Sequence, residues 1–401
     1  MIRYVTSGES HGRCLTAILE GIPSGLELDE DFINCELARR QKGFGRGERM
    51  KSIESDKVSI TSGVRHGRTL GSPIALTISN KDWENWKTIM ATEPSDADEK
   101  LKLTHPRPGH ADLPGILKFN TDDTRDILER ASARETASRV AVGAICKKFL
   151  REFGIKIISF TEEIAGICAP SIYPVGSRIA ELSIGVKMKI EDIAELAEKS
   201  AVRCLDEKTT QVIMEAIEKA KEDGDTVGGI FTVVVDGVPV GLGNHTQWDL
   251  KLDACLSYAV MSIQAIKGVE IGRGFDISRK LGSDVHDEIF YDKASGYWRK
   301  SNNAGGIEGG ISNGEQIIVR AAMKPIPSLS KPLQSVDIKT KESIKAQIVR
   351  SDICAVPAAG VIGEAVVAIE IAKAFCEKFG GDSIAEIKAN YTNYLDMLKS
   401  R

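Results

Sequence analysis

The chain has 401 residues, enough for two ordinary domains or for one large layered domain with an ample core. Its formal net charge of −4 and its isoelectric point near 6.0 argue against a general binder of nucleic acids or other polyanions. The eight cysteines lie far apart without Cys-x-x-Cys or zinc-type spacing, and the N-terminus has no apolar signal-peptide core. A soluble, cytoplasmic protein is therefore predicted.

Two strands are predicted at 2–6 and 13–19, joined by the turn Gly8-Glu9-Ser10-His11-Gly12. The glycines at both ends of this turn expose Ser10 and His11 at its tip. A histidine in such a turn is either simply solvated or placed for proton transfer, and the turn alone does not decide between the two.

A helix capped by Asp29 or Asp31 is predicted to end at Gln41 and to deliver a basic stretch, residues 39–51. In this stretch six basic residues face one acid, and three glycines let the backbone approach a ligand. Guanidinium groups match phosphate or carboxylate bidentately. The stretch therefore predicts a site for a small anion, with a solvated basic loop or a nucleic-acid patch as the alternatives.

A long polar run, 80–125, follows strands predicted at 57–62 and 73–79. Within the run, prolines on both sides of Arg107 exclude a helix and stiffen the chain. Loops of this length in compact proteins tend to hold functional groups, and an ordinary surface excursion is the alternative.

A strong helix is predicted to open at Arg130 and to run to Gly154, with Ser132 and Glu135 forming a capping box. Arg130 and Arg134 flank its N-terminus, whose N–H groups favour an anion, so a second phosphate site is predicted there. No glycine-rich nucleotide fingerprint follows any strand. The other predicted elements are strands at 155–160, 230–236 and 316–322 and helices near 191–200, 209–222, 250–262 and 358–378.

The most apolar segment, Ala358 to Phe375, is interrupted by glycines and charged residues, so it predicts a buried helix rather than a membrane span. The segment 302–314 is rich in glycine, which indicates backbone lying against a flat ligand or another chain, or a flexible loop.

Six motifs of glycine, charged and polar residues follow one another along the chain. They are Gly8-Glu9-Ser10-His11-Gly12, Arg107-Pro108-Gly109-His110-Ala111-Asp112, Arg130-Ala131-Ser132-Ala133-Arg134-Glu135-Thr136, Asn303-Ala304-Gly305-Gly306 with Gly309-Gly310-Ile311, Lys324-Pro325-Ile326 and Arg350-Ser351-Asp352. Taken together and in this order, they resemble the chorismate synthase family. The match runs from residue 1 into the final helices and is least clear between about 162 and 225. Ala131 departs from the family pattern, which usually has serine there, so a hydroxyl at that position cannot be needed here.

The resemblance implies a lyase that binds reduced FMN and 5-enolpyruvylshikimate 3-phosphate and makes chorismate by anti-1,4-elimination of phosphate. That reaction is the last step of the shikimate pathway and serves aromatic amino acid biosynthesis. The flavin would be reduced either with NADPH by the enzyme itself or by an external reductant. The resemblance also implies an α+β fold, one large β-α-β sandwich domain over residues 1–401, and a homotetramer.

By motif position, the resemblance assigns catalysis to His11 near the leaving phosphate, His110 near the flavin N1 side and Asp352 near the flavin N5. It implies no metal. Substrate anions would be held by Ser10, Arg40, Arg46, Arg49, Arg107, Arg134 and Arg350. Flavin-contacting segments would include Arg130, Ala131, Ser132, Gln264, Ala265, Gly309, Lys324, Pro325, Ile326, Pro327, Ser328 and Arg350.

Two functions of other classes stay open at this point. An RNA-binding protein would need aromatic platforms, but aromatic residues make up only 5% of the chain and Phe44 is the one aromatic residue in the basic stretch. A non-catalytic protein that binds a phosphorylated metabolite explains the arginines but leaves His11, His110 and Asp352 without a role.

Overall fold

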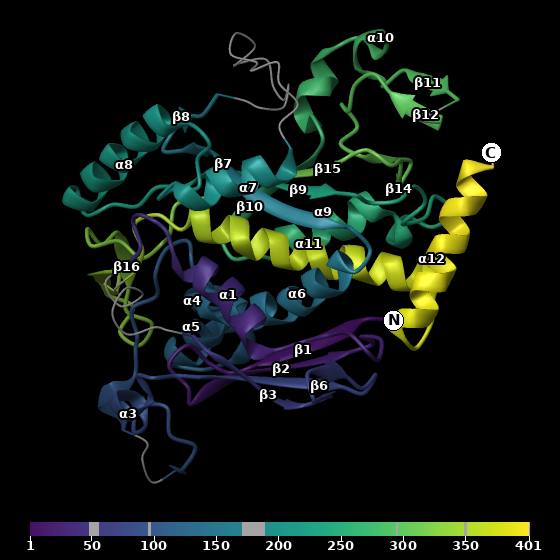
Figure 1. Ribbon diagram of the computed structural model, residues 1–401. Helices are drawn as coiled ribbons and strands as arrows, with labels where there is room; N and C mark the ends of the chain where they lie inside the picture. Colours follow the sequence, from purple (N-terminus) through teal and green to yellow (C-terminus); the bar gives the residue numbers. More distant parts are fainter. Residues whose placement is uncertain (48–55, 95–97, 171–188, 294–295, 349–350, 401) are drawn as a thin grey trace.

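The computed structural model describes residues 1–47, 56–94, 98–170, 189–293, 296–348 and 351–400, and its helices and sheets confirm the predicted α+β class (Figure 1). An antiparallel sheet of four strands has the order β1-β2-β6-β3. Its strands are β1 (Arg3–Ser7), β2 (Cys14–Glu20), β6 (Ile74–Ser79) and β3 (Val58–Ser62). A second antiparallel sheet has the order β10-β15-β9-β7-β8. Its strands are β10 (Ile266–Ile271), β15 (Ile317–Met323), β9 (Gly229–Asp236), β7 (Lys156–Ile164) and β8 (Ile167–Cys168).

Two long helices lie between the sheets, α6 (Thr136–Arg151) and α11 (Val356–Phe379) (Figure 1). Helix α6 packs on the first sheet through β2 and β6, α11 packs on β7 and β9 of the second sheet, and the two helices pack on each other. Glycine makes the helix crossing close, because a Cβ at Gly143 would lie 2.4 Å from the Cβ of Ala365.

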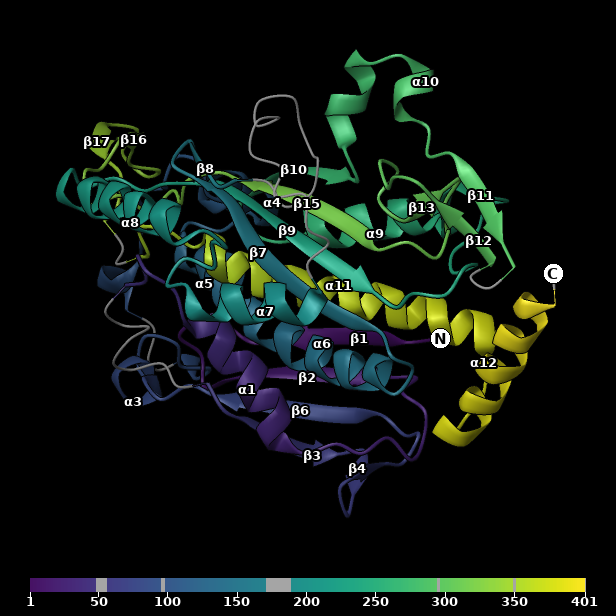
Figure 2. The same ribbon diagram turned by 45° about the horizontal axis from the view of Figure 1, so that its top comes forward.

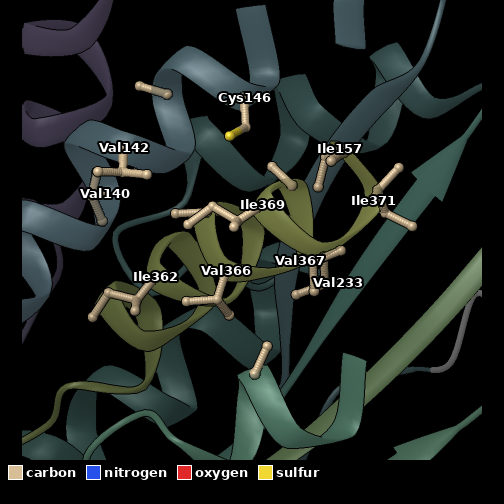
Figure 3. Close-up of a cluster of buried hydrophobic side chains, with 14 of the residues drawn as sticks. Val140, Val142, Cys146, Ile157, Val233, Ile362, Val366, Val367, Ile369 and Ile371 are labelled. Carbon is tan, nitrogen blue, oxygen red and sulfur yellow. The ribbon is translucent and has the colours of Figure 1, made fainter. Parts of the chain in front are cut away.

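Helix α11 is apolar around nearly its whole circumference, as expected for a helix covered on all sides. Figure 3 shows its side chains meeting those of α6, β7 and β9, with Ile369 and Val366 between Val140 and Val233. Gly363 brings the helix onto the sheet, since a Cβ there would lie 2.7 Å from the ring of Phe231. Among the residues that the structure describes, no helix is long and apolar enough to cross a membrane.

Other helices extend the helical layer or cover its surroundings (Figure 2). Helices α1 (Glu30–Gln41) and α9 (Leu252–Met261) both pack on α11. Helix α7 (Ile190–Lys199) packs on the outer face of β7, where Ile193 meets Phe160. The other elements used below are α3 (Trp83–Trp86), α4 (Asp112–Phe119), α5 (Arg125–Ala131), α8 (Glu207–Glu222), β11 (Ile289–Asp292), β12 (Gly296–Arg299), β13 (Ile307–Glu308), β14 (Ile311–Ser312) and α12 (Ile384–Lys399).

Most predicted elements are confirmed to within a few residues, but the helix predicted from 130 to 154 is interrupted. Helix α5 ends at Ala131, Ser132 is extended with φ −62° and ψ 141°, and α6 begins only at Thr136 after a short 3-10 turn. The predicted capping box is therefore wrong. Ser132 accepts from the N–H of Arg134, while the Glu135 carboxylate turns away to Thr6, Arg139 and Gln264.

A buried ionic cluster ties the central helices together. Glu364 of α11 is fully buried and accepts hydrogen bonds from Arg39 at 2.7 and 2.8 Å and from Lys147 at 2.6 Å. Burial alone would raise the pKa of Glu364, but the charges of Arg39 and Lys147 outweigh it and hold the pKa well below the usual value. Arg39, the first residue of the basic stretch, thus stabilises the core.

Candidate active site

The first sheet presents the turn that carries Ser10 and His11 against the end of α5. The backbone N–H of Ser10 donates to the carbonyl of Glu129 at 3.0 Å. The hydroxyls of Ser132 and Ser10 lie 3.2 Å apart, so the turn and the α5–α6 junction face each other. Two motifs separated by about 120 residues in the chain therefore form one surface.

Arg130, near the end of α5, binds the β1 end of this surface through hydrogen bonds. Its guanidinium group donates to the carbonyls of Thr6 at 2.9 Å and Gly8 at 3.0 Å and to the Thr6 hydroxyl at 2.8 Å. These bonds hold the end of β1 in place.

The two anion sites predicted from the sequence share one buried carboxylate. Arg40 at the end of α1 and Arg134 before α6 are 4% and 6% exposed, and both approach Asp56, at 3.5 and 3.0 Å. Arg40 also donates to the Thr136 hydroxyl and the Ala133 carbonyl, each at 3.0 Å. The two arginines are thus held at one place, where their guanidinium groups could bind a phosphate or a carboxylate bidentately.

The basic stretch also reaches the motif before α11. Arg46 pairs with Asp352 at 2.5 Å, and the N–H of Gly47 donates to the other carboxylate oxygen at 2.7 Å. The backbone of Ile353 donates to the Gly45 carbonyl at 2.8 Å, so the two segments run together. Arg350 and Arg49 both lie outside the described residues.

The polar run places Arg107 and His110 on one buried carboxylate. Asp112, the first residue of α4, accepts from the backbone N–H and Nε of Arg107 at 3.0 and 2.9 Å and pairs with His110 Nδ1 at 2.5 Å. Burial would raise the pKa of Asp112, but hydrogen bonds from His110 and Arg107 outweigh it and hold the pKa far below the usual value. Arg107 is 6% exposed and is held as part of this cluster rather than isolated.

The segment 324–328 joins the same group. Arg107 donates to the Ser328 hydroxyl at 2.9 Å, and Lys324 donates to the Gly109 carbonyl at 2.5 Å. The hydroxyl of Ser351 donates to the Ser328 carbonyl at 2.8 Å, which connects this segment to the Asp352 motif. The structure therefore brings three segments together: residues 107–112, residues 324–328 and the motif that contains Asp352.

Gln264 and Ala265 lie beside this group at the start of β10. Ala265 has a left-handed backbone, with φ 68°, and its carbonyl accepts from the Lys324 N–H at 2.9 Å. The amide nitrogen of Gln264 donates to Glu135 at 3.3 Å. Its amide oxygen is buried and has no hydrogen-bond partner within the described part of the chain. Gly309 lies in the β13–β14 turn, with left-handed φ and open space where a Cβ would be.

Three carboxylates of the site were not predicted as site residues: Asp56, Asp112 and Glu129. Their side chains are 1%, 1% and 2% exposed, and each faces an arginine or a histidine that had been predicted. A buried carboxylate needs a cation or hydrogen-bond donors as partners. Which cations lie near these three carboxylates depends on the fold, so the sequence alone carries no signal for them.

An α+β fold with buried arginines and two carboxylate-paired histidines is typical of an enzyme that binds a small anionic substrate. The family model described as chorismate synthase matches residues 2–376. The chorismate synthases of Geobacter sulfurreducens and Geotalea uraniireducens are 54% and 56% identical over 407 residues and are covered, like this chain, to 100%. A solved crystal structure of chorismate synthase, 45% identical, superposes with a TM-score of 0.79 over 100% of this chain and 99% of that one.

The chain belongs to the chorismate synthase family. It is an enzyme, a lyase of the shikimate pathway, as the resemblance of its motifs implied. Membership of this family decides against the RNA-binding protein and against the non-catalytic binding protein.

Proposed function

We propose that the chain binds reduced FMN and converts 5-enolpyruvylshikimate 3-phosphate into chorismate by anti-1,4-elimination of phosphate. The observation that carries the proposal is the convergence of Arg40 and Arg134 on the single carboxylate of Asp56. The substrate has one phosphate and two carboxylates, and guanidinium groups match such anions with paired hydrogen bonds.

The proposed roles of the chain's own residues follow from where their side chains are held. His11, with its ring on Glu129, would donate a proton as phosphate leaves, and His110, with its ring on Asp112, would act on the cofactor side. Asp352, oriented by Arg46 and the Gly47 N–H, would assist removal of the substrate hydrogen.

Arg40, Arg46 and Arg134 are proposed to bind substrate anions together with Ser10 and Arg107. Arg49 and Arg350 stay in the proposal by sequence position alone.

One buried polar atom, the side-chain oxygen of Gln264, suits a hydrogen bond to a flavin ring. The buried, unpartnered oxygen of Gln264 offers an acceptor to a ring N–H, beside the strained backbone of Ala265. Ala131, Ser132, Gly309 and the segment 324–328 would contribute to the same cofactor site. When bound, reduced flavin supplies electron density that lets phosphate depart from an unactivated ring, with no net redox change.

Further proposals concern the state of the enzyme in the cell. We propose a single β-α-β sandwich domain over residues 1–401, assembled as a homotetramer in the cytoplasm, with NADPH as one source of electrons for the flavin. None of the eight cysteines, all of which lie in the described part of the chain, forms a disulfide, which suits a reducing compartment. Apolar side chains are strongly exposed around α9 and the β11–β12 hairpin, which suits burial between subunits; they include Tyr258, Phe275, Leu281 and Tyr297.

The test is phosphate release from 5-enolpyruvylshikimate 3-phosphate under anaerobic conditions, with oxidised and with reduced FMN side by side. We expect stoichiometric phosphate and chorismate with reduced FMN and neither product with oxidised FMN. Equal phosphate release with both forms, or no release with reduced FMN, would contradict the proposal.

A further inference from the structure

The carboxylate of Glu129 is committed to His11. It lies 2.9 Å from the Nδ1 of His11 and accepts the backbone N–H of the same residue at 2.8 Å. Its side chain is 2% exposed, so these bonds replace the water that a carboxylate would otherwise bind. Arg125, one turn earlier on the same helix, adds a weaker contact at 3.4 Å. Because every contact described here brings a donor, Glu129 acts as an acceptor.

The acceptor role of Glu129 determines that Nδ1 of His11 carries a hydrogen. A carboxylate that accepts from Nδ1 requires a hydrogen on that nitrogen, so the proton that His11 gives to a ligand must be a second one, carried on Nε2. The same carboxylate also binds the backbone N–H, so the side chain and the main chain of His11 are oriented by one group.

Trp86 fixes the plane of the same ring. Its indole stacks on the imidazole, with ring centroids 3.7 Å apart and an interplanar angle of 26°. The indole Nε1 donates to Asp82 at 2.9 Å, and the guanidinium of Arg125 lies over the indole at 5.4 Å. His11, Glu129, Arg125 and Trp86 therefore close a ring of contacts around the imidazole, built from the β1–β2 turn, α3 and α5.

We propose that Glu129 and Trp86 are positioning residues for His11: Glu129 holds the Nδ1 hydrogen, so that the donated proton is the one on Nε2, and Trp86 holds the ring plane. The proposal rests on the proposed role of His11 in proton transfer. Glu129 also anchors the turn through the backbone, so the test must separate orientation of the imidazole from general support of the turn.

The test is a double-mutant cycle in the full-length enzyme with reduced FMN. Glu129→Gln keeps the side-chain volume but lets the amide present either a donor or an acceptor to Nδ1. We expect it to lower kcat at least about tenfold with little change in KM. In a His11→Ala background the same substitution should change kcat less than about twofold, because its target is gone. Glu84→Gln, an exposed glutamate on α3, is the matched control and should behave as the parent enzyme.

An activity-independent measurement follows the ring itself. The chain has four tryptophans, so the emission of Trp86 is isolated by subtracting the spectrum of the Trp86→Phe variant from that of the same protein with Trp86, both without substrate. We expect its intensity and its quenching by acrylamide to change in Glu129→Gln and to remain unchanged in Glu84→Gln.

Three outcomes can be told apart. Equal losses of kcat from Glu129→Gln with and without His11, or an unchanged Trp86 signal, would overturn the positioning role while the parent enzyme still turns over. Failure of the parent enzyme to release phosphate with reduced FMN would overturn the proposed function instead. The inference is supported if Glu129→Gln lowers kcat only in the enzyme that keeps His11, and if the fluorescence of Trp86 also changes.

Discussion

The carboxylate of Asp112 gives the sharpest prediction about the site. Its side chain is 1% exposed, and one oxygen accepts from the backbone N–H and Nε of Arg107 while the other faces His110 Nδ1 and Arg107 Nη2. Asp112→Asn can keep the first two bonds through its amide oxygen. Its NH2 group would then point at donors, and the buried guanidinium would lose its countercharge. Breaking a buried pair in this way costs about 3–5 kcal/mol.

This cost can be measured as a shift in melting temperature. For 401 residues, an unfolding entropy of about 2.1 cal/mol/K per residue gives roughly 0.8 kcal/mol/K, so the loss corresponds to about 4–6 °C. The exposed carboxylate Asp122, which pairs with Lys102, provides the matched control, and Asp122→Asn should leave the melting temperature nearly unchanged. Turnover of Asp112→Asn should also fall, since His110 loses its partner.

The pH dependence gives a second reading of the same variant. The pKa of Asp112 in the folded protein is lowered below the unfolded value of about 3.9. The carboxylate therefore stabilises the fold fully above that value, and its contribution is lost as the pH falls toward the folded-state pKa. The difference in melting temperature between the parent protein and Asp112→Asn should persist from pH 7 to pH 5 and shrink below about pH 4. Equal melting temperatures at pH 7, or a difference already lost at pH 5, would refute the reasoning.

Three further predictions concern single side chains. His11→Ala and His110→Ala should each lower turnover about 10²–10⁴-fold with the circular dichroism spectrum unchanged, and normal phosphate release in both would remove their catalytic assignment. Asp352→Asn should bind reduced FMN yet turn over slowly in single-turnover assays; if Arg46→Gln shows the same loss of rate, the ion pair alone explains the effect. Glu364→Gln removes a buried countercharge shared by Arg39, Lys147 and Arg203 and should lower unfolding stability by about 3–5 kcal/mol in denaturant titrations, while FMN affinity stays normal; unaltered stability would show that the cluster is not needed.

Much of this protein could be predicted from its sequence. Short runs of mainly apolar and β-branched residues located the strands, and the long apolar run from Ala358 to Phe375 located the central helix. The six motifs identified the family, because each keeps its own residue types and their order along the chain. Local patterns of this kind depend only on near neighbours, so they can be interpreted without knowing the fold.

The partners of the charged groups were decided by tertiary structure. Arg39 and Arg40 are adjacent in the sequence, yet on a helix their side chains point about 100° apart. One therefore enters the core to meet Glu364, and the other reaches the site. The capping box predicted at Ser132 failed for the same reason, because Glu135 found stronger partners in distant segments. A buried carboxylate is costly unless a cation lies beside it, and the packing of helices and sheets determines which cation is close enough.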